Sequence, residues 1–380
     1  MTEPADTSGA TARTPRPAAS SSGSSPLRLG CHSCHVTPRN DFRRRLYAAA
    51  NAVQERVAGL PGLIRHVSGP LDVACAEDEL VVLSIGRDAS PWIEDFVEHH
   101  LSLGARHVFF LDNASNDDTL ERAARLEHVT AFTTTLSFSR YEVGLRRWIT
   151  RRFGRDRWSL YCDADELFDY PYSDRLPLAG LLRYLRHHGY KAATGQMLDL
   201  FADRPFSAIE SRPGDRLRDV YRHYDLTDLV PTQEVYWIRD GQLANPEIVC
   251  LFGGIRKRFF GDDCLLLTKH PLLYADESVG VYTYDGHFHT RAPVADVSTA
   301  LLHYKYVASL PARVRRTVDE GWHNKAEALY GGLSSVLSEQ PDLCLRLDTA
   351  RELHDTNELV DAGFLVVSEQ YRQWVERYGR

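Results

Sequence analysis

The chain has 380 residues, 43% of them hydrophobic, and a formal net charge of -7 at pH 7. This apolar content can bury the core of one large domain or two modest ones. The acidic balance excludes a chain-wide basic field for nucleic acid or for an anionic membrane, although local basic clusters remain. No segment reaches the roughly 20 apolar residues that cross a bilayer, and the first residues lack a signal pattern. We therefore expect residence in the cytoplasm, with contact at the inner membrane face left open.

The first 40 residues are rich in Ser, Thr, Ala, Pro and Gly, a composition that predicts a disordered tail over residues 1–40. Within it, Cys31 and Cys34 precede His35 in the pattern of covalent haem attachment. We interpret this as a chance match, because no signal peptide precedes it, with occasional metal scavenging as the second interpretation. Residues 41–76 are expected to form an N-terminal arm.

Alternating strands and helices are predicted from residue 77 onward. An apolar run at 79–85 predicts a buried strand, and Ser90 and Pro91 predict the start of a helix that ends at Gly104. Further strands are expected at 107–111, 129–133 and 158–162, with helices after residue 119 and at 140–153. This order is typical of a doubly wound α/β domain, here placed at 77–310, with a helical C-terminal region at 311–380.

The strand predicted at 158–162 ends in two acidic residues, Asp163 and Asp165. An extended backbone sends residues two apart to the same side, so both carboxylates could face one divalent cation. Oxygen ligands of this kind suit Mg²⁺ or Mn²⁺, which complete their shells with water and substrate phosphates. The pair therefore predicts a site for a nucleotide diphosphate compound.

Two other predicted strands also end in polar residues, at Arg87 and at Asp112. Ligands of open α/β sheets gather outside the carboxyl ends of strands, so these clusters are expected to converge with Asp163. Helix capping accounts for Ser115 or Asn116, but capping does not require an acid directly at the strand end. The Asp112 carboxylate could accept hydrogen bonds from a ribose or a base edge.

Five segments between about residues 80 and 305 carry a family resemblance: 94–104, 110–117, 161–168, 253–258 and 302–305. In this order they resemble bacterial glycosyltransferase family 2-like proteins of the GT-A fold, related to glycosyltransferase family 92. The resemblance implies a GT-A-type, Rossmann-like α/β/α sandwich with a mixed, mostly parallel sheet and a helical C-terminal extension. It also implies transfer of a sugar from a UDP- or GDP-sugar to a hydroxyl of a glycan or glycolipid, with Mn²⁺ or Mg²⁺.

The resemblance assigns roles to individual residues. Asp163 and Asp165 would hold the metal, and the nucleoside would be bound by Arg87, Asp112, Asn113, Ser115 and Asp117. Family members commonly have Asn-Glu after the first strand, where this chain has Arg87 and Asp88.

The second half of the chain is expected to supply phosphate contacts and a base. Three cations, Arg256, Lys257 and Arg258, follow two glycines, so a flexible loop could bring them onto a leaving diphosphate; a solvated basic loop is the alternative. A third metal ligand could come from His289 or His303, for which a structural role is the alternative. The candidate bases for an inverting transfer are Asp262 and Asp263, with Asp228 and Glu234 left open.

Two other functions stay open at this point. Asp163 and Asp165 also match the first motif of an aspartyl-phosphate (HAD-like) phosphatase, with Asp262 and Asp263 as its second acidic motif. The order of motifs argues against it, since Lys269 follows that second motif instead of preceding it. A non-catalytic nucleotide-sugar-binding protein is the other alternative.

Overall fold

The structure is a computed structural model that describes residues 60–210, 215–232, 242–262, 265–279, 292–320 and 331–380. All of these residues belong to one compact unit, Val36–Arg380. The predictions for the tail at 1–40, for Cys31 and Cys34, and for Glu234, Asp263 and His289 lie outside the described residues.

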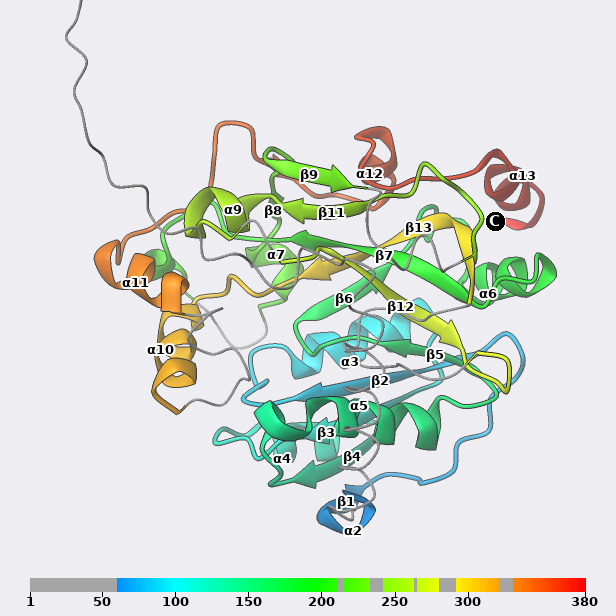
Figure 1. Ribbon diagram of the computed structural model, residues 1–380, viewed down its shortest axis with the longest axis horizontal. Helices are drawn as coiled ribbons and strands as arrows, with labels where there is room; N and C mark the ends of the chain where they lie inside the picture. Colours follow the sequence, from blue (N-terminus) through cyan, green and yellow to red (C-terminus); the bar gives the residue numbers. More distant parts are fainter. Residues whose placement is uncertain (1–59, 211–214, 233–241, 263–264, 280–291, 321–330) are drawn as a thin grey trace, which may run out of the picture. The chain divides into compact units, whose positions relative to one another are not determined.

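A large central sheet organises the described part of the chain (Figure 1). Five strand pairs in it are parallel (β4 with β3, β3 with β2, β2 with β5, β7 with β13, and β13 with β10) and four are antiparallel (β1 with β4, β5 with β12, β12 with β7, and β6 with β13). Along the sheet the strands are β1 (Ile64–Ser68), β4 (Val129–Thr134), β3 (His107–Asp112), β2 (Leu80–Gly86), β5 (Trp158–Tyr161), β12 (Thr268–Tyr274), β7 (Ala192–Asp199), β13 (Pro293–His303) and β10 (Gln242–Leu243), with β6 (Glu166–Asp169) on β13.

The strand directions bring many chain segments to one edge of the sheet. Because β12 is antiparallel to both of its neighbours, β5 and β7 run in the same direction. The carboxyl ends of β2, β3, β4, β5, β7 and β13 therefore share one edge, and β12 begins there. Polar residues that follow these strands are gathered along this edge.

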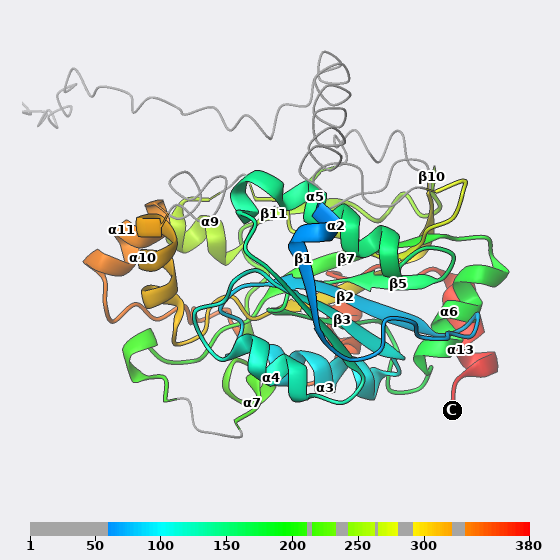
Figure 2. The same ribbon diagram turned by 90° about the horizontal axis from the view of Figure 1, so that it is seen from below.

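Helices cover both faces of the sheet (Figure 2). Helix α5 (Phe138–Phe153) packs on one face, where Phe153 stacks on Phe109 of β3 with ring centroids 4.0 Å apart. The other face carries α3 (Ile93–Leu103), α4 (Thr119–Arg125) and α6 (Leu178–His187), whose apolar stripes join the larger core. The α/β/α sandwich with a mixed, mostly parallel sheet is confirmed.

The C-terminal region is largely helical, as predicted. Its last helix packs against α6, where the Trp374 indole N–H donates to the backbone oxygen of Gly180 (3.2 Å). Among the described helices, none is long and apolar enough to span a membrane. The remaining elements are α2 (Leu60–Leu63), η1 (Phe206–Ala208), α7 (Leu217–Val220), α9 (Ile255–Phe260), α10 (Leu310–Glu320), α11 (Gly331–Glu339), α12 (Asn357–Asp361), α13 (Glu369–Tyr378), the pair β8 (His223–Tyr224) and β14 (Arg351–Glu352), and the pair β9 (Leu229–Thr232) and β11 (Cys250–Gly253).

Two local predictions were wrong. Helix α3 begins at Ile93 instead of Ser90, and residues 90–92 form a turn in which the Trp92 backbone N–H donates to the backbone oxygen of Ala89 (2.9 Å). Neither Ser115 nor Asn116 caps a helix, since α4 begins at Thr119. The Asp117 carboxylate accepts from the backbone N–H groups of Ser90 (3.3 Å) and Thr119 (3.1 Å), and so it joins the segment before α3 to the start of α4.

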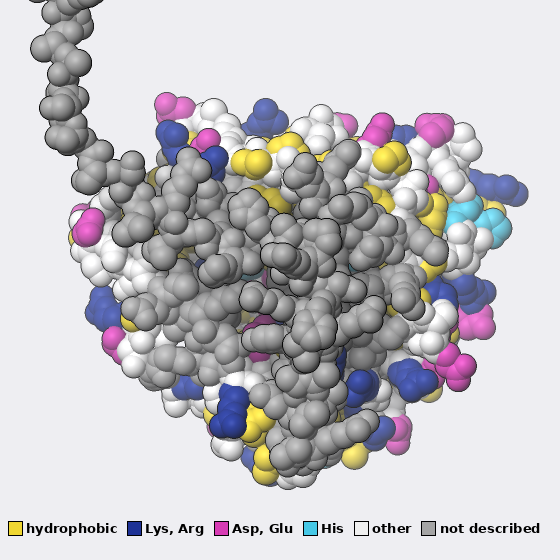
Figure 3. Space-filling view, in the orientation of Figure 1, with side chains coloured by type: hydrophobic (Ala, Val, Ile, Leu, Met, Phe, Trp, Pro, Cys, Tyr) yellow, Lys and Arg dark blue, Asp and Glu magenta, His cyan; other side chains and the backbone are white. Residues whose placement is uncertain are grey.

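Lys, Arg, Asp and Glu side chains are interspersed around the rim of the face drawn in Figure 3. Among the described residues, ion pairs at the surface include Arg183 with Asp78 (3.7 Å) and Arg122 with Asp118 (2.8 Å).

Candidate functional site

The strand order of the sheet reverses between β2 and β5. From β2 the chain adds β3 and then β4 on one side, and it returns to place β5 on the other side of β2. Open α/β sheets bind ligands outside the carboxyl ends of the strands at such a reversal. Residues 86–88, 112–117 and 162–166 lie at these strand ends, so the topology brings together the three clusters that the sequence singled out.

Asp163 and Asp165 lie in the turn between β5 and β6, where the Glu166 backbone N–H donates to the backbone oxygen of Asp163 (2.9 Å). The backbone here is a turn and not the extended segment that was predicted. The two acids contact different partners, although the Asp163 charge still acts to raise the pKa of Asp165.

The Asp163 carboxylate faces two cations. Lys269 Nζ, at the start of β12, lies 3.1 Å from Asp163 Oδ2, and an Arg146 guanidinium nitrogen from α5 lies 3.7 Å from Oδ1. Lys269 also forms an ion pair with Glu166, and both of these side chains are buried. Burial would lower the pKa of Lys269, but Asp163 and Glu166 hold that pKa above its usual value, while burial raises the pKa of Glu166. Lys269 is therefore a fixed positive charge at this end of the sheet.

The Asp165 carboxylate faces His303, the last residue of β13. His303 Nε2 lies 3.5 Å from Asp165 Oδ2, and the Tyr304 backbone N–H donates to the backbone oxygen of Asp165 (2.7 Å). Burial alone would raise the pKa of Asp165, but His303 overcomes this and holds that pKa below its usual value. Burial would likewise lower the pKa of His303, yet Asp165 and Asp199 raise it. The pair thus favours a carboxylate beside an imidazolium.

A second buried carboxylate binds the other ring nitrogen of His303. Asp199, the last residue of β7, lies opposite His303 in the register of β7 and β13, and its Oδ1 is 2.5 Å from His303 Nδ1. Arg256 donates to both carboxylate oxygens of Asp199, from Nε at 2.6 Å and from Nη2 at 2.7 Å. Burial would raise the pKa of Asp199, but Arg256 and His303 hold it well below its usual range.

The side chains at this edge of the sheet include oxygen and nitrogen atoms that could bind a divalent cation. Among the described residues, no group of three or more His, Cys, Asp or Glu side chains is arranged to hold a metal ion. Magnesium and similar cations are, however, bound through one or two carboxylates together with substrate phosphates. Asp165, with 22% of its side chain exposed, and the neighbouring Nε2 of His303 fit this smaller set. Asp163 is engaged by two cations, and His289 lies outside the described residues.

The segment from Asp112 to Asp117 is held by internal hydrogen bonds. Asp112 accepts from the hydroxyl and the backbone N–H of Ser115 and from the Thr133 hydroxyl (3.1 Å), and burial raises its pKa. Ser115 also accepts from the Asp88 backbone N–H (2.9 Å), which ties the end of β3 to the end of β2. These side chains shape the loop at the reversal point.

Asn113 and Arg87 are placed differently from these loop-building residues. The Asn113 amide donates to the backbone oxygens of Leu136 (2.7 Å) and Thr134 (3.2 Å), while its buried Oδ1 has no hydrogen-bond partner among the described residues. Arg87 keeps 19% of its side chain exposed beside Asp88, with the two charged groups 4.0 Å apart. An unpaired buried acceptor is costly, so Asn113 offers a position for a donor group from a ligand.

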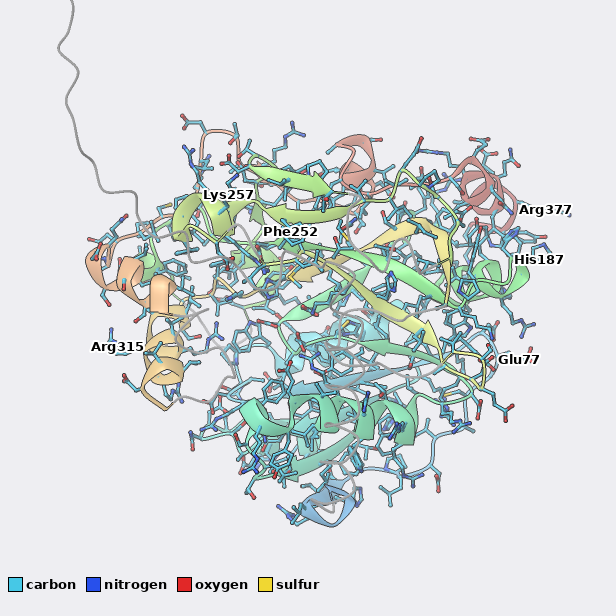
Figure 4. The ribbon with its side chains drawn as sticks, viewed as in Figure 1. Glu77, His187, Phe252, Lys257, Arg315 and Arg377 are labelled. Atoms are coloured by element: carbon cyan, nitrogen blue, oxygen red, sulfur yellow. The ribbon has the colours of Figure 1, made fainter. Side chains whose placement is uncertain are left out.

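The three cations predicted on a flexible loop lie instead on the short helix α9, which follows Gly253 and Gly254. Arg256 is buried against Asp199, whereas Lys257 and Arg258 are exposed, with Lys257 on α9 in Figure 4. Asp262 follows this helix, is half-buried, and accepts from the Leu265 backbone N–H at 3.1 Å. Their predicted roles toward a diphosphate and an acceptor hydroxyl remain predictions.

Sequence reasoning missed Asp199 and Lys269 as site residues. Asp199 ends the strand Ala192–Asp199, whose centre is Thr194, Gly195 and Gln196, so the apolar signal that identified Asp112 and Asp163 is interrupted there. Lys269 carries no such signal, because it reaches Asp163 only through the antiparallel placement of β12 beside β5.

No family model and no curated relative matches this chain. A search of solved structures found a mannosyltransferase, PcManGT from Pyrobaculum calidifontis, in complex with GDP-Man and Mn²⁺; it is 14% identical, covers 88% of this chain and 95% of that chain, and has a TM-score of 0.30. S. aureus TarS 1–349 in complex with UDP is 12% identical, covers 39% of this chain and 41% of that chain, and has a TM-score of 0.27.

A second structure of TarS 1–349 is 13% identical, with a TM-score of 0.27. The match covers 32% of this chain and only 36% of that chain, so this chain spans about a third of that TarS structure. Similarities with TM-scores below 0.5 assign neither a family nor an activity to this chain.

Proposed function

We propose that this chain is a GT-A-type glycosyltransferase of the family 2-like kind, which moves a sugar from a UDP- or GDP-sugar to a hydroxyl of a glycan or glycolipid. The observation that carries the proposal is the turn with Asp163 and Asp165 at the reversal point of the sheet, surrounded by Arg146, Lys269 and His303. A nucleotide diphosphate sugar joins a polar nucleoside to a doubly charged anion. The loop that carries the unpaired Asn113 oxygen suits the nucleoside, and the neighbouring cations suit the diphosphate.

The nucleoside would bind at the ends of β2 and β3. The unpaired Oδ1 of Asn113 would accept a hydrogen bond from the donor nucleotide, and Arg87 would face it from the end of β2. Asp112, Ser115 and Asp117 would act by holding the loop in shape through the hydrogen bonds described above. This division of labour follows from which polar atoms the protein itself already satisfies.

The diphosphate would lie next to Asp165. A divalent cation, Mn²⁺ or Mg²⁺, would be held there by Asp165 and the neutral form of His303, and when bound it neutralises charge on the leaving diphosphate. Lys269 and Arg146 hold the Asp163 side chain, and so they fix the turn from which Asp165 projects. The exposed cations Lys257 and Arg258 remain candidates for direct phosphate contact.

The transfer itself needs few groups from the protein. The acceptor oxygen forms a bond to the anomeric carbon of the sugar while the bond from that carbon to the diphosphate oxygen breaks. In an inverting transfer the proton of the acceptor hydroxyl passes to a carboxylate, for which we propose Asp262 or Asp263. The remaining rate enhancement comes from holding donor and acceptor in line.

Calorimetric titration of UDP and GDP, each with and without Mn²⁺, tests this proposal. Wild type should bind one nucleotide in a metal-dependent manner, and Asp165→Asn should weaken that binding by roughly 10- to 100-fold. Asp296→Asn is the matched control, because Asp296 is a buried carboxylate of β13 that accepts from the Tyr184 hydroxyl (2.7 Å) near the opposite end of the strand.

If neither nucleotide bound to the wild type, the proposal would be refuted, and hydrolysis of p-nitrophenyl phosphate would then test the phosphatase alternative. If the nucleotide bound but no sugar was released from the corresponding UDP- or GDP-sugar, with water or a glycan as acceptor, the non-catalytic binding protein would replace it.

A further inference from the structure

A buried row of three side chains lies behind Asp165. Arg256 donates to both oxygens of Asp199, Asp199 contacts Nδ1 of His303, and Nε2 of His303 faces Asp165. Arg256, Asp199 and His303 are 6%, 7% and 6% exposed, respectively. Burial of three ionisable groups costs desolvation free energy, which is offset when the groups form hydrogen bonds and ion pairs with one another.

The geometry selects the position of the proton on His303. A separation of 2.5 Å between Asp199 Oδ1 and His303 Nδ1 requires a proton between the two atoms. The two hydrogen bonds from Arg256 keep Asp199 ionised, so this proton belongs to Nδ1 of the ring. In the neutral imidazole, the lone pair is then on Nε2, the nitrogen that faces Asp165 at 3.5 Å.

We infer that Asp199 and Arg256 are positioning residues that fix the tautomer of His303 and present its Nε2 as a ligand atom beside Asp165. The inference rests on the proposed function, because it concerns the cation that accompanies the donor diphosphate. Carboxylates that accept from the second nitrogen of a metal-binding histidine set its ring orientation and raise its basicity. Arg256 thereby acts through Asp199 and not on the diphosphate, since both of its carboxylate-facing nitrogens are occupied.

The same three residues show how the other tautomer of His303, with the proton on Nε2, could form. Arg256 Nη2 lies 3.0 Å from His303 Nδ1, so it could donate to this nitrogen if the Asp199 charge were removed. In Asp199→Asn, the ring proton should therefore move to Nε2, and this nitrogen would no longer bind a cation. In Arg256→Met, buried Asp199 loses the two donors that keep it ionised, so the Nδ1–H form should lose population to the Nε2–H form.

Two readouts test the inference, and only one of them involves a metal. The first is NMR of protein labelled with ¹⁵N-histidine, recorded above the pH at which the His303 signals stop changing, because Asp165 and Asp199 raise the pKa of this ring. The His303 signals are assigned from a His303→Gln sample. The second is calorimetric titration of Mn²⁺ in the presence of UDP or GDP. Wild type should show Nδ1–H, Asp199→Asn should show Nε2–H with cation affinity reduced roughly 10- to 100-fold, and Arg256→Met should change both readouts in the same direction. The control Asp296→Asn should match the wild type in both.

The wild-type spectrum alone tests the inference, because it shows which ring nitrogen of His303 carries the proton. The inference can therefore be refuted even if a variant fails to fold. An Nε2–H form in the wild type, or an Nδ1–H form retained in folded Asp199→Asn, would overturn it. Absence of nucleotide and cation binding by a wild type with the Nδ1–H form would instead overturn the proposed function, and with it the ligand role of His303.

Discussion

Truncation of Lys269 should strongly destabilise the protein. In Lys269→Met the apolar length of the side chain is kept, but buried Glu166 loses its counter-charge and Asp163 loses a partner at 3.1 Å. At an effective dielectric constant of about 20, the Asp163 contact alone corresponds to a gross attraction of about 5 kcal/mol, which solvent screening reduces because a third of Asp163 is exposed. Removal of one partner of a buried pair costs about 3–5 kcal/mol, and we expect a loss in this range at neutral pH.

The pH dependence of this loss provides a sharper test. Burial already raises the pKa of Glu166, and without Lys269 that pKa should rise further above the value of the unfolded chain. A carboxyl group with a raised folded pKa favours folding at low pH and disfavours it as pH rises through the folded pKa. The deficit of Lys269→Met should therefore shrink from about pH 8 to about pH 5.

Chemical denaturation followed by circular dichroism measures both effects. The double variant Lys269→Met/Glu166→Gln removes the buried charge as well as its partner, and it should recover most of the lost stability. A single variant within about 1 kcal/mol of the wild type, or a deficit that grows toward low pH, would refute the reasoning.

Three further outcomes are expected from denaturation experiments on single variants. Burial lowers the pKa of His99 to about 4, so protonation of this residue in the unfolded chain should cost about 2 kcal/mol of stability by about pH 5. His99→Gln should therefore flatten the dependence of stability on pH in this range. An unchanged dependence would contradict the role given to His99. Gly253→Ala should lower the free energy of unfolding by at least about 2 kcal/mol, since φ is +81° and the new Cβ would lie 2.4 Å from the Asp228 backbone oxygen. Gly363→Ala, at φ +73° in open space, should lower it by only about 1 kcal/mol. Equal losses in the two variants would exclude the steric argument. Ile149→Ala should lower the free energy of unfolding by about 2–5 kcal/mol, because this side chain is fully buried between α5 and the sheet. The control Arg151→Ala, on the exposed side of α5, should change it by less than about 0.5 kcal/mol. A small loss for Ile149→Ala would show that α5 does not pack as described.

Much of the sheet could be predicted because its signals are local. Near-continuous apolar runs predicted the strands that became β2, β3 and β5, since strands buried on both faces carry no polar alternation. The end of α3 at Gly104 was predicted for the same kind of reason: φ there is 114°, a conformation that glycine adopts without strain.

The partners of each site residue could not be predicted, because they come from distant parts of the chain. Lys269 follows Asp163 by more than 100 residues, and the two meet only because β12 inserts between β5 and β7 in the antiparallel direction. Arg256 looked like a mobile surface cation, yet the register of β7 and β13 places Asp199 and His303 where they bury its guanidinium.

By itself, the sequence determined the α/β class, the main strands of the first half, and the strand ends at which Asp112 and Asp163 lie. These properties depend on short-range hydrophobic patterning, which a single segment carries without its neighbours. Only the tertiary structure decided that Asp163 is neutralised by Lys269 and Arg146 while Asp165 faces His303. Strand order and register decide which charges become buried together, and the energetic cost of an unpaired buried charge then decides which of them form pairs.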